Sequence, residues 1–408
     1  AAACKAVYAG SIPASASTHM IPYGKQDISN SDIKAVTDVL KSPMLTQGPL
    51  VPKFEERLAS YCGVKYATAV NSATSGLHLA CLALGLSKGD ILWTSPITFV
   101  ASANCGIYCG AKVDFVDIDP KTFNISHESL LEKINQAKSK NQLPKILVLV
   151  HMCGLAVELR KIRTLCNKYK IKIVEDASHA LGSNYEGSMT GGCHYSDITV
   201  FSFHPVKMIT TAEGGMITTN SKALDRKLKA LRTHGIYRPA KMIAKQPWYY
   251  EQQDLGFNFR MTDIAAALGL NQMKRIDKFV NIRNRIAERY IKKLKDLPLK
   301  FQSEEVTSKN SYHLFVVQLD LSKLKKTKYH LDLFKYLRSN GINVNLHYMP
   351  VYKHPFYAKM RKFMPMKNAE AYYATSISLP IFTTLTVKEQ DKVVSIISNY
   401  FSKIKLSN

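Results

Sequence analysis

The feature that most constrains the fold is an alternation of short apolar runs and helical stretches between about residues 50 and 220. Apolar strands separated by helices are typical of a largely parallel sheet covered on both faces. We therefore predict an α/β fold whose mixed sheet is built from seven runs: KYATAV (65–70), DILWTS (90–95), KVDFVDI (112–118), KILVLV (145–150), IKIVED (171–176), DITVFSF (197–203) and GGMITTN (214–220). HLACLALGL (78–86) is apolar all round, which predicts a buried helix.

The length of the chain, 408 residues, exceeds the size at which a single core usually divides. We expect a large domain over residues 20–268 and a smaller C-terminal α+β domain over residues 269–408, which opens with charged amphipathic helices. Residues 1–19 are small, polar and without pattern, and we expect them to be a tag or a disordered leader. No apolar run is long enough for a membrane span, so we expect a soluble protein.

The eight cysteines contain no CxxC pair and lie mostly among apolar residues. Buried free thiols in a reducing cytosol explain them better than disulfides or zinc, so we expect a cytoplasmic protein without a metal. Cys105 and Cys109 have helical spacing, but no further His or Cys pair completes a metal site.

The net charge of +25 could indicate nucleic acid binding. The basic residues are scattered over predicted helix faces, however, and no nucleic-acid-binding motif accompanies them. A lysine-rich surface explains the charge better, and its positive field would attract an anionic small-molecule substrate.

Open parallel sheets bind ligands beyond the carboxyl ends of their strands, and polar residues follow three of the predicted strands. The first group is Asn71-Ser72-Ala73-Thr74-Ser75-Gly76, which leads into the buried helix. Free N–H groups and the positive end of the helix dipole would bind a phosphate there. Ordinary N-capping by serine or threonine is the structural alternative.

The second group begins with Asp176, at the end of IKIVED, and continues through His179. A carboxylate at the end of an apolar strand needs a cationic or hydrogen-bonding partner. A protonated pyridine nitrogen would be one such partner, as in pyridoxal-phosphate (PLP) enzymes. A strand-end aspartate that caps the next turn is the alternative.

The third group contains Lys207, in a short polar loop between two apolar strands. Most lysines are solvated surface residues, and this chain has many. Lys207, however, follows Ser202-Phe203-His204-Pro205 and precedes the Gly214-Gly215 pair, which permits a close backbone approach. A lysine amine whose pKa is lowered by burial suits Schiff-base chemistry.

Together these groups resemble the DegT/DnrJ/EryC1/StrS family of PLP-dependent sugar aminotransferases of fold type I. The resemblance extends from Ile21 to the C-terminus. Further stretches that carry it are LTQGPLVPKFEERLASYCGVKYA, SPITFVASAN, KVDFVDIDPKTFNI, RTHGI, LGFNFRMTDIAAALGLNQ and HYMPVY. It implies a PLP cofactor that cycles with pyridoxamine phosphate.

The resemblance also implies roles for individual residues. Lys207 matches the Schiff-base lysine and proton shuttle, and Asp176 matches the partner of the pyridine nitrogen. His179, where many members have Gln, matches the residue near the phenolic oxygen, and Phe99 matches the aromatic that stacks on the ring. The remaining matches concern the phosphate: Thr74, Ser75 and Ser202 from the same subunit, and Asn258 from the other subunit of a homodimer with shared active sites.

Family members that dehydrate sugars carry His at the lysine position, so Lys207 favours transamination. The resemblance implies ping-pong transfer from L-glutamate to the C4 ketone of a nucleotide-linked 4-keto-6-deoxy sugar. FSFHPVKMITTAEGG, NSATSGLHLA and ASHALGS are similar to the branch of the family in pseudaminic-acid biosynthesis, which implies a UDP-linked N-acetylated sugar. Four residues are candidates for substrate contacts by their position in the family, and a structural role explains each of them equally well: Arg260, His313, His347 and Tyr348.

Two alternatives remain open at this point. One is a PLP-dependent sugar dehydratase or lyase on the same fold. The other is a basic, non-catalytic nucleic-acid-binding protein that has kept the fold. The nucleotide and the stereochemistry of the sugar are not determined by the sequence.

Overall fold

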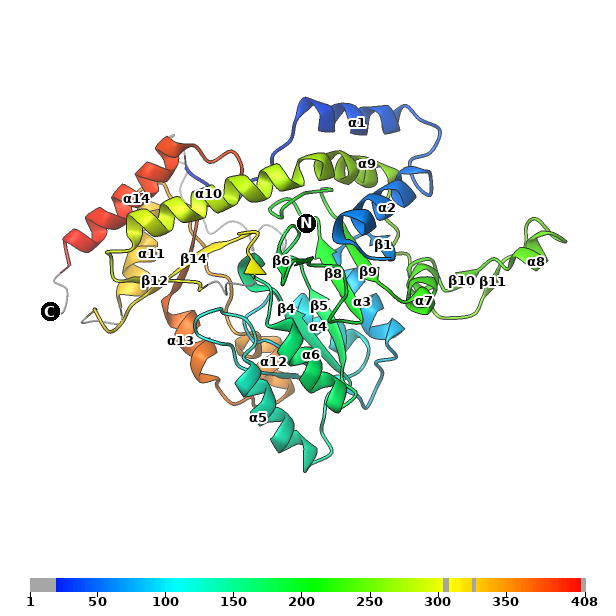
Figure 1. The fold of residues 1–408 in the computed structure, drawn as a ribbon, viewed down its shortest axis with the longest axis horizontal. Helices are drawn as coiled ribbons and strands as arrows, with labels where there is room; N and C mark the ends of the chain where they lie inside the picture. Colours follow the sequence, from blue (N-terminus) through cyan, green and yellow to red (C-terminus); the bar gives the residue numbers. More distant parts are fainter. Residues whose placement is uncertain (1–19, 304–307, 325–327, 405–408) are drawn as a thin grey trace.

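The computed structural model describes residues 20–303, 308–324 and 328–404, and the leader expected at residues 1–19 lies outside this part of the chain. Its centre is a seven-stranded sheet (Figure 1). All seven runs predicted as strands are in it, in the order β1 (Tyr66–Val70), β9 (Gly215–Thr219), β8 (Ile198–Ser202), β5 (Lys172–Asp176), β4 (Ile146–Val150), β2 (Ile91–Thr94) and β3 (Lys112–Phe115). The prediction of a mostly parallel mixed sheet is confirmed.

One strand gives the sheet its mixed character. β9 runs antiparallel to both of its neighbours, β1 and β8, whereas the pairs β8–β5, β5–β4, β4–β2 and β2–β3 are parallel. The carboxyl ends of the parallel strands therefore meet at one edge of the sheet. Asp176 ends β5 and Ser202 ends β8, so both lie at that edge.

Helices cover both faces of the sheet. One core holds α3 (Ala73–Ala83), α4 (Ala101–Tyr108) and α7 (Lys222–Arg232) against alternate strand residues such as Val148. On the opposite face, α5 (His127–Lys138) and α6 (Leu159–Lys168) pack around Leu147 and Leu149, and α2 (Leu50–Cys62) packs beside them on β8 and β9. The predicted buried helix is α3, which begins five residues before His78 and ends at Ala83.

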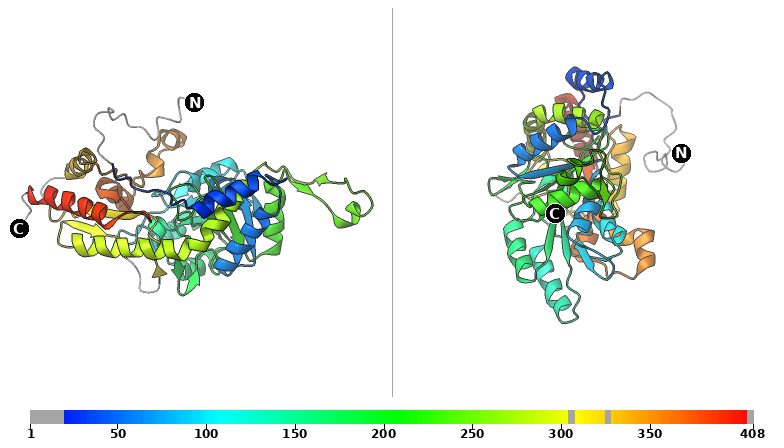
Figure 2. Two further views of the ribbon diagram at one scale, coloured as in Figure 1. Left: turned by 90° about the horizontal axis from the view of Figure 1, so that it is seen from above. Right: turned by 90° about the vertical axis from the view of Figure 1, so that its right-hand side faces the viewer.

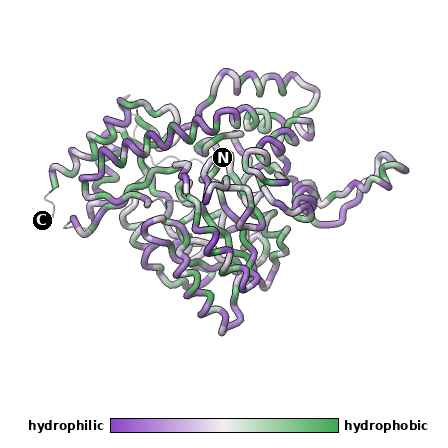
Figure 3. Tube along the Cα trace, in the orientation of Figure 1, coloured by the Kyte–Doolittle hydropathy of each residue, from purple (hydrophilic) through white to green (hydrophobic). Residues whose placement is uncertain are grey.

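A second core lies around a small antiparallel sheet of β12 (Leu299–Phe301), β14 (Phe315–Leu319) and β15 (Ser376–Leu379). The helices around it are α10 (Ile276–Leu294), α11 (Tyr329–Ser339) and α14 (Val387–Ser402). Hydrophilic and hydrophobic residues alternate along α10, as Figure 3 shows, because one side packs on this core. The predicted division after residue 268 falls within α9 (Asp263–Gln272) and stays a prediction.

A hairpin of β10 (Ile236–Tyr237), α8 (Ala240–Ile243) and β11 (Glu251–Gln252) projects from the body of the molecule (Figures 1 and 2). The remaining elements are α1 (Asn30–Leu40), β6 (Asn184–Tyr185), β7 (Ser188–Met189), β13 (Ser308–Lys309), α12 (Pro355–Met360), α13 (Lys367–Thr375) and three short 3-10 turns, η2 (Met152–Gly154), η3 (Met273–Arg275) and η4 (Val351–Lys353). Among the described residues, no helix combines the length and the apolar character that a membrane crossing requires.

Candidate active site

Asp176 is held on both carboxylate oxygens at the end of β5. Its Oδ2 accepts a hydrogen bond of 2.6 Å from the Oγ of Ser102, at the start of α4. Its Oδ1 accepts from the backbone N–H of Ser178 at 3.1 Å and from the Ser178 hydroxyl at 2.6 Å. The side chain is buried, and three donors from two segments fix its orientation.

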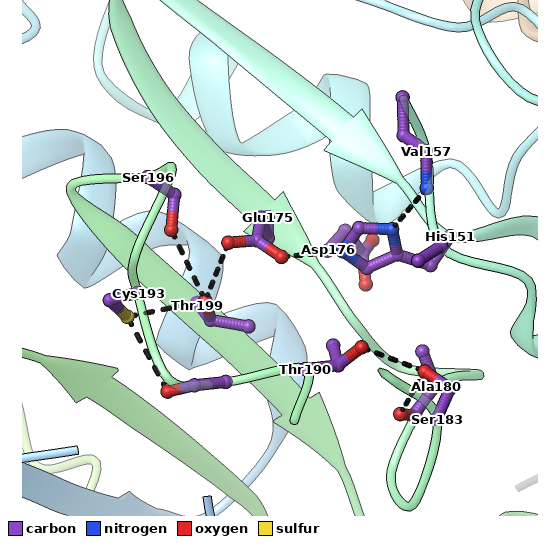
Figure 4. Close-up of polar contacts among 12 residues, drawn as sticks. His151, Val157, Glu175, Asp176, Ala180, Ser183, Thr190, Cys193, Ser196 and Thr199 are labelled. Carbon is purple, nitrogen blue, oxygen red and sulfur yellow. Dashed lines mark hydrogen bonds and ion pairs between the residues drawn. The ribbon is translucent and has the colours of Figure 1, made fainter. Parts of the chain in front are cut away.

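A second buried carboxylate, Glu175, anchors the same strand end (Figure 4). Its Oε2 lies 2.7 Å from the Nε2 of His151, while Thr199 donates to Oε1 at 3.1 Å. The Nδ1 of His151 accepts from the N–H of Val157, which leaves Nε2 to donate to Glu175. Burial acts to raise the pKa of Glu175, but the hydrogen bond and charge of His151 outweigh it and hold the pKa below its ordinary value.

His151 also connects this network to Asp176, because its backbone N–H donates to the carbonyl of Asp176 at 3.2 Å. The network therefore fixes the backbone of the residue whose side chain faces the candidate site. Glu175 and Asp176 both accept hydrogen bonds from several donors, and these bonds offset the desolvation cost of burying two adjacent carboxylates.

Lys207 lies in the loop between β8 and β9, and its backbone N–H donates to the carbonyl of His204. Its Nζ is 3.5 Å from the Nε2 of His313. Burial lowers the pKa of Lys207 to about 8, against the opposing effect of the negative charge of Asp176. Near neutral pH a much larger share of this amine is neutral than of a surface lysine.

Three buried histidines surround the amine. The rings of His179 and His313 lie 4.4 Å apart, and the Nε2 of His179 is 3.2 Å from the hydroxyl of Tyr348. Burial and the charge of Lys207 hold the pKa values of both imidazoles well below the ordinary range, and they lower that of His347 to about 3. At neutral pH all three rings are therefore uncharged.

Two of these rings carry a buried nitrogen without a partner. The Nδ1 atoms of His179 and His313 have no hydrogen bond among the described residues. His313 is held in place from behind, because the buried guanidinium of Arg283 donates to its backbone carbonyl at 3.2 Å. Buried polar atoms are rarely left unsatisfied, so these two nitrogens are candidates for contact with a polar ligand.

His347 and Tyr348 come from the segment before η4. The Nδ1 of His347 is 2.8 Å from the Oγ of Ser378, on β15. The ring of Tyr348 lies 6.3 Å from that of Phe99, between β2 and α4. The side chain of Phe99 is 58% exposed, so this aromatic face is open to a planar ligand.

The start of α3 is the segment predicted from the sequence to bind a phosphate. Ser72 is the N-cap, and its Oγ accepts from the N–H of Ser75 at 3.1 Å. The Oγ of Ser75 donates to the side chain of Asn71 at 2.7 Å. Thr74 lies in the first turn, where unpaired N–H groups and the helix dipole favour an anion.

Gly215 allows β9 to approach this helix terminus. A Cβ at Gly215 would lie 2.7 Å from the backbone nitrogen of Ala73, a contact that real side chains do not make. The close backbone approach expected of the glycine pair is confirmed at this position. Ser202 pairs with Gly215 across the sheet, and its Oγ accepts from the N–H of His204 at 3.4 Å.

Asn258 and Arg260 flank Phe259, which contacts the segment before α3. Asn258 is exposed and forms a bridge with Thr233, and the carbonyl of Phe259 accepts from the N–H of Asn71 at 2.9 Å. Among the described residues the side chain of Arg260 has no hydrogen-bond or ion-pair partner. The structure thus brings Lys207, His313, His179 and Tyr348 into one connected group and places Asn258 and Arg260 outside it.

Two residues that orient Asp176, Ser102 and Ser178, are not among the site residues predicted from the sequence. Ser178 could have been found, because it lies two residues after the aspartate and such a serine commonly donates back. Ser102 is 74 residues away from Asp176 in the sequence. The only sequence signal for it is that it is a polar residue among apolar neighbours on a short helix. Its hydroxyl also contacts that of Thr98 at 2.7 Å.

Comparison with known proteins agrees with this geometry. The family model described as the DegT/DnrJ/EryC1/StrS aminotransferase family matches residues 26–398. A UDP-4-amino-4,6-dideoxy-N-acetyl-beta-L-altrosamine transaminase of Campylobacter jejuni is 39% identical over 388 residues, which are 95% of this chain and 99% of the relative.

Solved structures are similar over the same length. The Helicobacter pylori aminotransferase PseC, involved in the biosynthesis of pseudoaminic acid, has a TM-score of 0.87 at 32% identity and covers 94% of this chain and 100% of its own. The Streptococcus pneumoniae sugar aminotransferase Spr1654 has a TM-score of 0.86 at 27% identity in its PMP form, over 94% and 100% of the two chains, and is also known in a PLP form. The chain belongs to the DegT/DnrJ/EryC1/StrS aminotransferase family, and it is a PLP-dependent sugar aminotransferase.

Proposed function

We propose that this enzyme transfers the amino group of L-glutamate to the C4 ketone of a UDP-linked, N-acetylated 4-keto-6-deoxy sugar. The observation that carries the proposal is the buried amine of Lys207, whose lowered pKa leaves a share of it neutral near pH 7. The amine lies beside buried, uncharged histidines, and the carboxylate of Asp176 acts on its pKa. The similarity to the Campylobacter UDP-4-amino-4,6-dideoxy-N-acetyl-beta-L-altrosamine transaminase supports this carrier and this position.

The residues of the site fit pyridoxal phosphate. The start of α3, with Thr74 and Ser75, suits the phosphate, and Ser202 lies next to it across Gly215. The exposed ring of Phe99 suits one face of a planar cofactor. When bound, pyridoxal phosphate supplies an aldehyde carbon for amines and a ring that accepts electron density from the reacting carbon.

Two further residues act on the cofactor ring in this proposal. Asp176, fixed by Ser102 and Ser178, holds a proton on the pyridine nitrogen, which maintains the ring as an electron acceptor. The orphan Nδ1 of His179 is available to the phenolic oxygen. Both assignments follow the positions of the family motif.

Lys207 has two tasks. Its neutral Nζ binds the cofactor in the resting enzyme, and once released it moves a proton at the α-carbon of glutamate and at C4 of the sugar. A pKa of about 8 allows the same amine to take a proton and return it near neutral pH. Glutamate reacts first and leaves as 2-oxoglutarate, and the sugar reacts second, which is a ping-pong order.

The sugar nucleotide would be bound by residues around the same pocket. His313, His347 and Tyr348 offer uncharged hydrogen-bonding groups to sugar hydroxyls and the N-acetyl group. Arg260 offers a cation to the diphosphate. The orphan Nδ1 of His313 gives this residue the strongest structural support among the four candidates.

We further propose a homodimer in which the projecting hairpin contacts the partner. Three large hydrophobic side chains on and after the hairpin are exposed, namely Trp248 (75%), Tyr250 (63%) and Leu255 (83%). An apolar surface of this kind on an extended arm is typical of a protein interface. Asn258, at the base of the arm, would reach the phosphate of the partner's cofactor.

Subunit mixing tests the shared site. Lys207→Ala and Asn258→Ala homodimers are each impaired, but a mixed dimer contains one site in which both residues are natural. We expect the mixture to regain activity above that of either parent. If the mixture stays at the level of the parents, Asn258 acts within its own chain or in no active site.

We propose a cytoplasmic enzyme. Seven cysteines of the described residues are free thiols, and all but Cys109 are buried. Burial raises the pKa of Cys166 to about 12 and that of Cys193 to about 11, so these thiols are unreactive structural residues. Fractionation of cells followed by immunodetection should find the enzyme in the cytoplasmic fraction, and its recovery among exported proteins would contradict this proposal.

A substrate panel tests the function itself. The holoenzyme is incubated with L-glutamate and the UDP-, dTDP- and GDP-linked forms of a 4-keto-6-deoxy sugar, and 2-oxoglutarate and the amino sugar are measured by mass spectrometry. We expect turnover with the UDP sugar. A dehydratase would instead release water from the sugar without forming 2-oxoglutarate, and a nucleic-acid-binding protein would turn over nothing and bind DNA in a salt-dependent way.

A further inference from the structure

A cavity lies at the amino ends of β2 and β3, whereas the candidate active site lies at the carboxyl ends of the parallel strands. It has a volume of about 560 Å³ and opens beside β3, the last strand of the sheet. Its walls come from β2, β3, α5 and α12, at the end of the molecule where α5 and α12 appear in Figure 1. We call it the β3 groove, defined by six of its lining residues: Trp93, Asp114, Lys133, Tyr357, Arg361 and Phe363.

The charges of the β3 groove are unbalanced. Lys133 and Arg361 share one carboxylate, that of Asp114, at 2.9 Å and 2.7 Å. Lys112 and Lys140 add two further cations to the lining. The groove therefore presents four cationic side chains against a single anionic one.

Lys133 is the cation most in need of a counter-charge. Only 22% of its side chain is exposed, and burial, followed by the nearby positive charge of Arg361, holds its pKa below the ordinary value although Asp114 opposes this effect. A second anion in the groove would raise the pKa of Lys133 again, because opposite charges at short range favour the charged form of an amine.

Aromatic side chains complete the walls. The Nζ of Lys133 lies 5.1 Å from the centre of the Trp93 ring, and the guanidinium of Arg361 lies 4.4 Å from that of Phe363. Trp93 and Tyr357 are each only 2% exposed and form the buried floor, whereas Phe363 is partly exposed. Aromatic rings and a stacked guanidinium next to cations are suited to a planar base that carries phosphate.

A purely structural role explains only part of this arrangement. Arg361 donates to the carbonyl of Val113 at 3.3 Å and so protects the open edge of β3, a common use of charged residues on edge strands. That role does not require Lys133, which projects from α5 over Trp93, or a cavity large enough for a small molecule.

We propose that the β3 groove binds a nucleoside diphosphate, with its phosphates against the cationic side chains of the lining and its base beside Phe363 and the stacked guanidinium of Arg361. This site is separate from the active site and adds to the proposed function.

Trp93 provides a local reporter. The chain has two tryptophans, so Trp248→Phe, on the exposed hairpin, leaves Trp93 as the only indole. Titration of this holoenzyme variant with UDP should change the fluorescence of Trp93 in a saturable way. UDP held only in the active site would leave this signal unchanged, and that result would overturn the proposal.

Two substitutions distinguish UDP binding at the groove from nonspecific attraction to the positively charged surface. In the same background, Lys133→Met keeps the packing on Trp93 and Arg361→Gln keeps a donor, and each should weaken UDP binding at least tenfold. Lys138→Ala removes an exposed lysine of α5 that does not line the groove and should leave binding unchanged. An equal loss in all three variants contradicts a specific site.

Inorganic pyrophosphate tests the recognition of the base. We expect pyrophosphate to bind at least tenfold more weakly than UDP, because it lacks a ring for the aromatic walls. Equal binding of the two probes would overturn the nucleoside part of the proposal. Comparison of UDP with ADP in a final arm distinguishes a uracil-specific groove from one that accepts any base.

Discussion

The hydroxyl of Ser102 donates a 2.6 Å hydrogen bond to the Oδ2 of Asp176, which joins the start of α4 to the end of β5. This bond orients the carboxylate that is proposed to keep the cofactor ring protonated. Ser102→Ala removes the donor without adding volume. Because hydrogen bonds to charged groups contribute about 1.5–3 kcal/mol, we expect kcat to fall by roughly tenfold to a hundredfold.

The matched control is Ser87→Ala, which removes a similar serine-to-aspartate bond, to Asp90, on the surface. It should leave kcat unchanged. Bound cofactor reports the same effect without turnover, because a misplaced Asp176 should shift the visible absorption of the holoenzyme. An unchanged spectrum and kcat in Ser102→Ala would mean that Ser178 alone orients the carboxylate.

The pKa of Lys207 predicts how cofactor uptake depends on pH. Only the neutral amine reacts, so the rate at which the apoenzyme takes up PLP should rise about tenfold per pH unit up to about pH 8 and then level off. Stopped-flow absorbance measures it. Asp176→Asn should move the midpoint lower, since the carboxylate raises the pKa of Lys207. A rate that keeps rising to pH 10 would contradict the burial of this amine.

Gly215→Ala tests the approach of β9 to the start of α3. Its Cβ would collide with backbone atoms of Ala73 and Ser72, and the helix terminus must move. We expect a loss of stability of about 1–3 kcal/mol, as for other overpacked sites, and at least tenfold weaker retention of PLP. Dialysis followed by absorbance measures retention. Gly24→Ala, whose nearest neighbour would be 3.7 Å away, is the control and should behave as the natural protein.

The buried histidines predict a loss of stability in acid. The pKa of His347 is about 3 in the folded protein and near 6.5 when unfolded, so the unfolded chain binds the extra proton between these values. The contribution of this group is complete above pH 6.5 and is lost as the pH falls toward 3, by at most about 1.4 kcal/mol per pH unit.

Chemical denaturation at several pH values measures this effect. His347→Gln should be less stable at pH 7, where it loses the bond to Ser378, but its free energy of unfolding should decline less steeply in acid. His194→Gln, at an exposed position, is the control and should follow the natural curve. Equal slopes for His347→Gln and the natural protein would contradict a neutral, buried imidazole.

Much of the fold could be predicted because its strands are continuous apolar runs. All seven became strands of one sheet, and the parallel arrangement placed Asp176 and Ser202 at one edge. The order of the strands could not be predicted, because it depends on packing between distant segments. Nothing in the local pattern of residues 214–220 marked β9 as the reversed strand.

The candidate site likewise contains residues that the sequence identifies and residues that it does not. Lys207, Asp176 and the start of α3 follow strand ends and could be identified from the sequence. The contact between Lys207 and His313 joins residues 106 positions apart in the sequence. Such contacts arise from tertiary packing alone, which is why the sequence offered His313 only through family resemblance and missed Ser102 entirely.

The most direct test of the account is the mass and colour of the purified enzyme with and without Lys207. Borohydride reduction of the PLP-loaded natural protein, followed by peptide mass spectrometry, should find the cofactor attached to Lys207. Lys207→Ala should lack this adduct, lose the yellow colour and show no transamination. A cofactor adduct on another lysine, or unchanged transamination in Lys207→Ala, would contradict the account.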